Sequence, residues 1–222
     1  MPVYASSLVL PAFEAKRDVM LRVGLTGGVA SGKSTIAAML VERGAHFLQA
    51  DGLAHQLYEP GTIIYDEVVR RFGREILKED GTINRTKLAN VVFPDRIGEL
   101  NAIVHPEVVK RQNIWMSEIE RQDPRGIAVV EAALLTEAGA DKDFDKVIVV
   151  TCDFDRKVEH FARRTNAPLE VARSEVKRRS AAQFTDEEKA RRADYVIRNS
   201  GSIEDTERQV EKIWRELQTS QH

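Results

Sequence analysis

A glycine-rich run near the N-terminus carries the residues best suited to chemistry. Residues 27–35 read GGVASGKST, in which Gly27 to Ser34 match the pattern G-x-x-x-x-G-K-[ST]. Glycines let successive backbone N–H groups point at phosphate oxygens, and a helix that starts beside them adds its positive end. In this pattern Lys33 reaches the β- and γ-phosphates and the Ser34 hydroxyl binds Mg²⁺. The loop therefore predicts binding of a nucleoside triphosphate with Mg²⁺.

Asp51 is the second candidate for chemistry, because it follows a predicted strand that ends at Gln49. The carboxyl ends of parallel strands lie at one edge of a sheet, so this carboxylate is expected beside the phosphate loop. There it would accept a proton from an acceptor hydroxyl or help to hold Mg²⁺ through water. The position suits an N-cap of a helix beginning at Gly52 equally well. Both interpretations stay open on sequence alone.

A basic segment occupies residues 156–192. It holds eleven lysines and arginines against six acids, in a chain whose formal net charge is -2. Arginine binds phosphate oxygens through paired hydrogen bonds, so this composition on a pair of helices predicts a lid over a triphosphate. A solvated helical face is the alternative. A nucleic-acid surface is disfavoured, because stacking aromatic residues do not interleave with the charges.

The elements that position these residues follow from apolar runs and helical spacing. Strands are predicted at 21–26, 45–49, 127–130, 147–151 and 195–197. Helices are predicted at 33–43, 63–72, 88–92, 97–104, 107–121 and from Ser202 onward. Strands that alternate with helices predict an α/β fold with a parallel sheet flanked by helices. The strand-free stretch before residue 127 indicates a helical insertion.

Composition limits the class of protein. The 222 residues are 42% hydrophobic and 31% charged, which is enough for a core and unlike a disordered chain. The 33 basic and 35 acidic side chains nearly balance, so neither nucleic acid nor an anionic membrane is expected as a partner. No apolar run approaches the roughly 20 residues that span a bilayer. Cys152 is the sole cysteine and cannot form an internal disulfide, which agrees with a cytoplasmic location.

Residues 1–19 precede the first predicted strand. They contain a short apolar patch broken by Pro11, without the basic start and longer apolar stretch of a signal peptide. We expect a disordered extension or a start codon assigned too early, with Met20 as the other start. A functional arm is the alternative interpretation.

Motifs elsewhere in the sequence indicate which class of nucleotide-binding protein carries this loop. An N-K-x-D motif for guanine is missing, and the D-x-x-G at Asp95 falls in a helical stretch. An apolar run that ends at Glu131 is usual in mechanical ATPases, so this feature alone does not exclude that class of protein. An acid beside the loop together with a basic lid favours a small-molecule kinase.

An ordered series of short motifs resembles the dephospho-coenzyme A kinase family over about residues 20–217. The series comprises the phosphate loop, Ala50-Asp51, Glu59-Pro60-Gly61, Phe72-Gly73, DGTINR at 80–85, LNAIVHP at 100–106, LLTE at 134–137, ADYVI at 193–197 and Asn199-Ser200-Gly201. The LNAIVHP segment and the order of the set are more specific than the phosphate loop. The resemblance implies a P-loop core like that of nucleoside monophosphate kinases. It also implies transfer of the γ-phosphate of ATP to the ribose 3′-hydroxyl of dephospho-coenzyme A, the last step of coenzyme A biosynthesis.

The resemblance also implies roles for single residues and regions. ATP would be bound by Gly28, Val29, Ala30, Ser31, Gly32, Lys33, Ser34, Thr35, Arg164 and Asn199, with Ser34 on the Mg²⁺ ion. Lys33 and Asp51 would be catalytic, and Asp51, Arg85 and His105 would contact dephospho-coenzyme A. The nucleotide core would comprise 20–60, 123–155 and 193–222, the acceptor lobe 61–122 and the lid 156–192.

Three departures from the family pattern bear on these roles. Gln49 stands where the family often has a first aspartate, and the usual Pro-Leu-Leu-Phe-Glu appears as Ala-Leu-Leu-Thr-Glu at 133–137. His160 replaces the first arginine of the lid's R-x-x-x-R, whose second is Arg164. Its neighbour Arg163 is expected to point about 100° away on a helix. A kinase with another acceptor and a nucleotide-binding module without phosphoryl transfer are the alternative functions.

Overall fold

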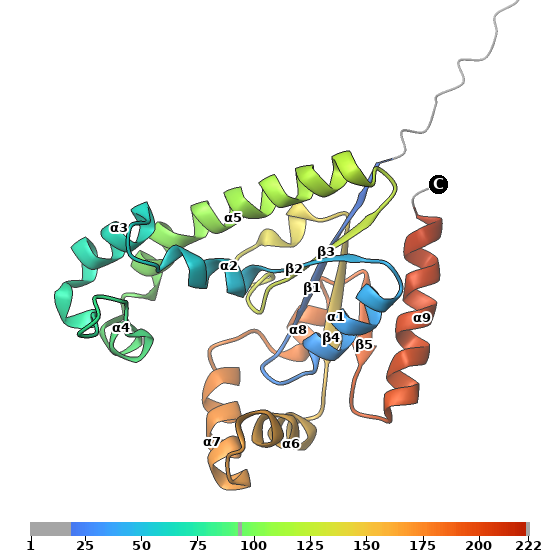
Figure 1. Cartoon of the computed structure of the whole chain (residues 1–222). Coiled ribbons are helices and arrows are strands. Elements are labelled where there is room, and N and C mark those ends of the chain that lie inside the picture. The colour runs from blue at the N-terminus through green and yellow to red at the C-terminus, as the bar shows by residue number, and fades with distance from the viewer. Residues whose placement is uncertain (1–18, 93–94, 221–222) are drawn as a thin grey trace, which may run out of the picture.

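The computed structural model describes residues 19–92 and 95–220. Residues 1–18, which make up most of the predicted disordered extension, lie outside the described residues. Five parallel strands form one sheet in the order β2-β3-β1-β4-β5 (Figure 1). The strands are β1 (Leu21–Gly27), β2 (His46–Gln49), β3 (Ile127–Glu131), β4 (Lys146–Thr151) and β5 (Tyr195–Arg198). The predicted α/β class is confirmed.

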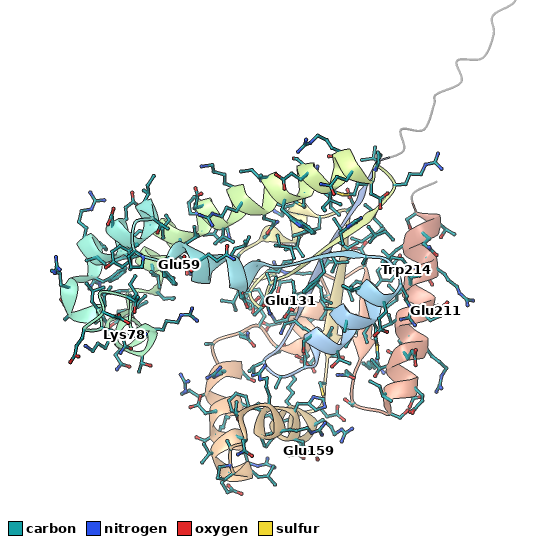
Figure 2. The ribbon with its side chains drawn as sticks, viewed as in Figure 1. Glu59, Lys78, Glu131, Glu159, Glu211 and Trp214 are labelled. Carbon is teal, nitrogen blue, oxygen red and sulfur yellow. The ribbon has the colours of Figure 1, made fainter. Side chains whose placement is uncertain are left out.

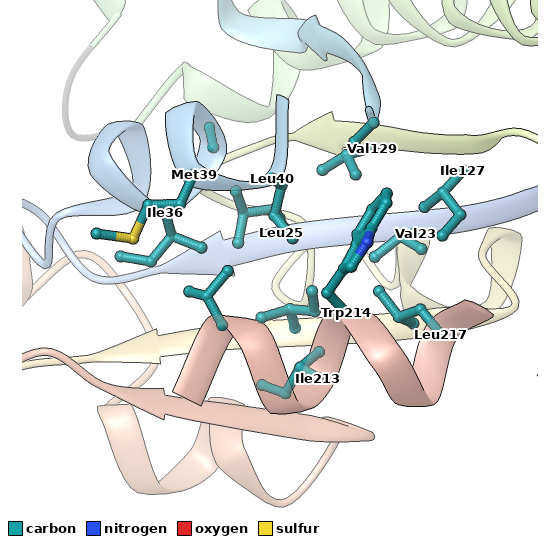
Figure 3. Close-up of a cluster of buried hydrophobic side chains, with 14 of the residues drawn as sticks. Val23, Leu25, Ile36, Met39, Leu40, Ile127, Val129, Ile213, Trp214 and Leu217 are labelled. Carbon is teal, nitrogen blue, oxygen red and sulfur yellow. The ribbon is translucent and has the colours of Figure 1, made fainter. Parts of the chain in front are cut away.

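One face of the sheet packs against two helices. Alternate side chains of a strand point to the same face, so Leu25 and its equivalents in the neighbouring strands meet α1 (Lys33–Glu42) and α9 (Ile203–Thr219). Figure 3 shows Trp214 and Leu217 of α9 pointing toward the strands of the sheet. This cluster holds α1 against the sheet, and the phosphate loop leads directly into that helix.

The opposite face is covered by the C-terminal half of a long helix, α5 (Ile97–Gln122). Its Met116 packs with Ala128 and Val130 of β3. The sequence predicted two helices that part before residue 107, but the structure has one helix with Pro106 inside it. A proline in a helix removes one backbone hydrogen bond and crowds the preceding turn. Packing on both sides of Pro106 outweighs that penalty, so the predicted break is wrong.

The N-terminal half of α5 belongs to a helical lobe that extends from the sheet (Figure 1). The lobe also contains α2 (Ala50–Leu57), α3 (Ile63–Phe72), a short 3-10 helix (Arg74–Ile76) and α4 (Arg85–Val92). These elements share a second hydrophobic cluster of Leu57, Ile64, Val68, Phe72, Ile76, Ile83, Leu88, Val92 and Val104. The lobe therefore has a core of its own, to which α2 contributes although the predicted lobe begins at residue 61.

The basic segment folds into three helices, α6 (Phe154–Thr165), α7 (Leu169–Ser180) and α8 (Asp186–Ala190). Between β3 and β4 lies a further 3-10 helix (Ala140–Asp143). Helices α6 and α7 pack on each other through Val158, Phe161, Ala172 and Val176, and Val29 and Ala30 of the phosphate loop rest against them. The segment predicted as a lid thus lies beside the loop. Across the described ranges, none of the helices has the length and apolar content that crossing a membrane requires.

Candidate active site

The phosphate loop joins the end of β1 at Gly27 to the start of α1 at Lys33. Its backbone needs glycine at Gly32, where φ is 95° and an added Cβ would collide with the side chain of Asn199. Ala30 also has a positive φ, of 55°, which is uncommon for a residue with a side chain. The loop therefore follows the tight path that turns backbone N–H groups inward.

Asn199, which directly follows β5, links the phosphate loop to α9 by hydrogen bonds. Its Nδ2 donates to the Ser31 carbonyl at 2.9 Å, and its Oδ1 accepts from the Thr206 hydroxyl at 2.9 Å. The side chain is buried, so both hydrogen bonds are shielded from water. The residue predicted to lie near ATP therefore also fixes the shape of the loop.

Asn199→Ala is expected to lower the free energy of unfolding by about 1–3 kcal/mol, because the Ser31 carbonyl loses the Asn199 donor and the Thr206 hydroxyl keeps only the Ser202 carbonyl. The KM for ATP should rise as the loop loosens, and steady-state kinetics with thermal unfolding will measure both effects. Thr206→Ser keeps a hydroxyl and serves as the control. An unchanged KM for ATP in the alanine variant would contradict the bracing role.

A cavity of about 490 Å³ opens over the phosphate loop. It is lined by Ala30, Ser31, Gly32, Lys33, Ser34, Thr35, Gln49, Glu131, Arg156, His160, Arg163, Arg164, Asn199, Gly201 and Ile203. Eight of the ten residues predicted to bind ATP meet here. Gly28 instead lines a neighbouring pocket, and the Val29 N–H donates to Gln183 Oε1 at 3.0 Å.

Lys33 lies at the floor of this cavity. Its Nζ donates to the carbonyls of Gly27 and Gly28 at 3.0 and 3.2 Å, which holds the ammonium across the loop. Burial lowers the pKa of Lys33, while the charges of Glu131 and Asp51 raise it in part. Both carboxylates therefore lie near enough to act on the lysine charge.

Glu131 is a site residue that the sequence analysis missed. It ends β3, is only 6% exposed, and has an Oε2 without a hydrogen-bond partner among the described residues. Burial raises the pKa of Glu131; Lys33 lowers it, and Asp51 raises it further. Figure 2 places Glu131 between the lobe and the basic helices. The signal was present, since an apolar run ended in this acid, but it was attributed to another class of ATPase.

Asp51 lies in the first turn of α2, which begins at Ala50. The N-cap interpretation is therefore wrong, because Asp51 is already inside the helix. Its carboxylate lies in the turn that carries the positive end of the helix dipole. Asp51 also lines a second cavity, of about 240 Å³. Its charge acts on the pKa of Lys33, so the acid lies near the phosphate loop.

The second cavity lies where the lobe meets the sheet. Of the residues that line it, the polar ones are Asp51, Tyr58, Asn101, His105, Gln112 and Asp143. His105 thus joins Asp51 there, as the resemblance implied. Burial raises the pKa of Tyr58 and the Arg85 charge lowers it, which puts Arg85 near this wall. Tyr58 and Gln112 had no sequence signal, because they come together only where the lobe packs against α5.

The basic helices contribute four polar side chains to the first cavity. Arg163 and Arg164 both line it, although neighbours on a helix were expected to diverge. Arg164 lies close enough for its charge to lower the pKa of Lys33. His160, at the position of an expected arginine, donates from Nδ1 to the Ala30 carbonyl at 3.1 Å. Cationic groups thus face the loop from above.

Comparison with known proteins agrees with this geometry. The family model of dephospho-CoA kinase matches residues 21–205. The dephospho-CoA kinase of Symbiobacterium thermophilum is 42% identical over 196 residues, or 87% of this chain and 80% of the relative. That of Aquifex aeolicus is 40% identical over 200 residues, or 89% of this chain and 98% of the relative.

Two solved structures resemble the fold. The protein TT1252 from Thermus thermophilus is 33% identical and superposes with a TM-score of 0.75, covering 90% of this chain and 98% of that one. Dephospho-CoA kinase from Campylobacter jejuni is 22% identical, with a TM-score of 0.57 over 89% of this chain and 97% of that one.

Proposed function

Because this chain belongs to the dephospho-CoA kinase family, we propose that it transfers the γ-phosphate of ATP to the ribose 3′-hydroxyl of dephospho-coenzyme A. The product is coenzyme A, so the reaction is the last step of coenzyme A biosynthesis. The observation that carries the proposal is a pair of cavities, one lined by Lys33 and the other by Asp51, whose charges act on each other. One has a phosphate loop for a donor, and the other has polar groups for an acceptor.

Phosphoryl transfer needs mainly positioning and stabilisation of charge, because the transition state makes few bonds to the protein. Lys33 and Arg164 supply positive charge to the transferred group. Asp51 orients the acceptor hydroxyl and takes its proton. Arg85 and His105 bind the acceptor from the lobe. Helices α6 and α7 cover the triphosphate and exclude water from it.

We propose Mg²⁺ as the metal, which would supply positive charge to the phosphates of ATP when bound. Within the described ranges no cluster of three or more His, Cys, Asp or Glu side chains could hold a metal. Mg²⁺ does not need such a cluster, because it retains water and takes ligands from the nucleotide. The Ser34 hydroxyl and the unpartnered Oε2 of Glu131 are oxygen donors at the loop and fit this mode of binding.

The proposed partners are thus ATP and dephospho-coenzyme A, with neither nucleic acid nor a membrane, and the proposed location is the cytoplasm. The test is a coupled kinase assay of the purified chain with Mg-ATP and dephospho-coenzyme A, beside AMP, CMP and shikimate. We expect dephospho-coenzyme A to be preferred clearly. A preference for one of the other acceptors would favour a different kinase, and ATP binding without transfer would favour a binding module.

A further inference from the structure

The segment Gln183–Lys189, which we call the junction segment, links α7 to the end of α8. It contacts three other parts of the chain: the phosphate loop, the base of α6, and the loop that follows β3. That last loop includes Ala132, Leu134, Leu135, Ala138 and Ala140, all of which line the second cavity. The junction segment therefore contacts both substrate sites without entering either cavity.

On the side of the phosphate loop, side chains of the junction segment accept hydrogen bonds from two backbone N–H groups and from Lys157. Gln183 Oε1 accepts from the Val29 N–H at 3.0 Å. Asp186 pairs with Lys157 Nζ at 2.8 Å through both oxygens and accepts from the Cys152 N–H at 3.1 Å. These bonds tie the segment to the loop and to the end of β4.

On the acceptor side, a buried ion pair holds the loop after β3. Lys189 is completely buried, and its Nζ donates to Glu137 at 2.6 and 2.8 Å and to the Ala133 carbonyl at 3.1 Å. Glu137 Oε1 also accepts from the Phe184 N–H at 2.9 Å. Each of the three ammonium protons thus has an acceptor.

The buried pair of Lys189 and Glu137 is expected to fix the position of the loop after β3. Replacing a buried ion pair by apolar residues of the same size is often neutral for stability, and in some proteins such a pair instead specifies one arrangement of the chain. Burial raises the pKa of Glu137, but hydrogen bonds from Lys189, Phe184 and Thr136 outweigh it and leave that pKa below its usual value. A carboxylate that stays charged in this place keeps the loop in one position.

We propose that Lys189 and Glu137 are positioning residues that set the wall of the acceptor cavity, while Gln183 in the same segment sets the phosphate loop. The junction segment would then fix the distance between donor and acceptor. The identity of the acceptor rests on the function proposed above.

The test compares four variants in steady-state kinetics with both substrates. Lys189→Met is expected to raise the KM for dephospho-coenzyme A by about ten- to a hundred-fold, because small displacements of a substrate are costly. The KM for ATP should change by less than about two-fold, which corresponds to a free-energy change smaller than RT. The reason is that Gln183 still holds the phosphate loop in this variant. Gln183→Ala should show the reverse split, and Glu137→Gln, which leaves the buried Lys189 charge without a carboxylate, should raise the KM for dephospho-coenzyme A as Lys189→Met does.

Lys189→Met leaves Glu137 buried without its partner and can unfold the protein. The double variant Glu137→Leu with Lys189→Met removes that problem, because an apolar pair restores packing. We expect it to regain the melting temperature while the KM for dephospho-coenzyme A stays raised. A purely structural pair would regain both.

The activity of the wild type distinguishes a failure of the proposed function from a failure of this inference. If the wild type does not phosphorylate dephospho-coenzyme A, the proposed function and this inference are both wrong. If the wild type is active and the stable double variant has a normal KM for dephospho-coenzyme A, only the inference is overturned.

Discussion

Asp51→Asn is expected to lower kcat by about 10²- to 10⁴-fold, the usual effect of removing a general base. Asparagine keeps the shape of the side chain but has neither the charge nor the basicity. The carboxylate lines the second cavity and acts on the pKa of both Lys33 and Glu131, so the substitution removes a negative charge beside the groups proposed to react. Binding of ATP should persist, because the phosphate loop is untouched. Turnover assays and titration calorimetry with ATP measure the two quantities.

Asp66→Asn is the matched control for this variant. Asp66 is an exposed acid in the first turn of α3, as Asp51 is in the first turn of α2. Either substitution should cost about 0.3–1 kcal/mol of stability at most, through the helix dipole. Only Asp51→Asn should lose activity. Near-normal turnover in that variant would leave Asp51 with a structural role alone.

Lys33→Ala is expected to lower kcat by about 10²- to 10³-fold, equivalent to about 2.7–4 kcal/mol, the loss seen when one preorganised contact to a transition state is removed. Lys33 Nζ now spans the carbonyls of Gly27 and Gly28, beside the position that phosphates take in such loops. Lys212→Ala, which removes an exposed lysine on α9, is the control and should be fully active. A folded Lys33 variant with unchanged kcat would contradict the role of the loop.

The same variant has a second expected effect, on pH dependence. The Lys33 charge lowers the pKa of Glu131, so its removal should raise that pKa further. A carboxylate with a raised pKa takes up a proton at higher pH. The residual activity of Lys33→Ala should therefore decline at a higher pH on the acid side than that of the wild type.

The sequence predicted the phosphate loop and the strand positions well, because both depend on neighbours in the chain. It missed what depends on packing between distant segments. Pro106 normally indicates a helix end, yet α5 continues through it because the helix packs on both sides. Lys189 reads as one more charge in a basic segment, although it is the most buried of them. Neither the continuation of α5 through Pro106 nor the burial of Lys189 can be inferred from the residues next to them in the sequence.

The departures from the family pattern also become clearer. Gln49, where an aspartate is common, lines the first cavity, and its side chain donates a hydrogen bond to Glu131. A neutral amide there avoids a third negative charge beside Glu131 and Asp51. Likewise His160 contacts the backbone of the loop, and Arg156, Arg163 and Arg164 are the arginines of that helix in the cavity.

Helix α5 takes part in two hydrophobic clusters at once. Val104 is buried in the cluster of the lobe, Met116 is buried against the sheet, and Val108 packs against both. The lobe therefore cannot unfold completely without withdrawing part of the helix that supports the sheet. The two regions should melt in one cooperative transition, and amide exchange along α5 should be slow on either side of Pro106.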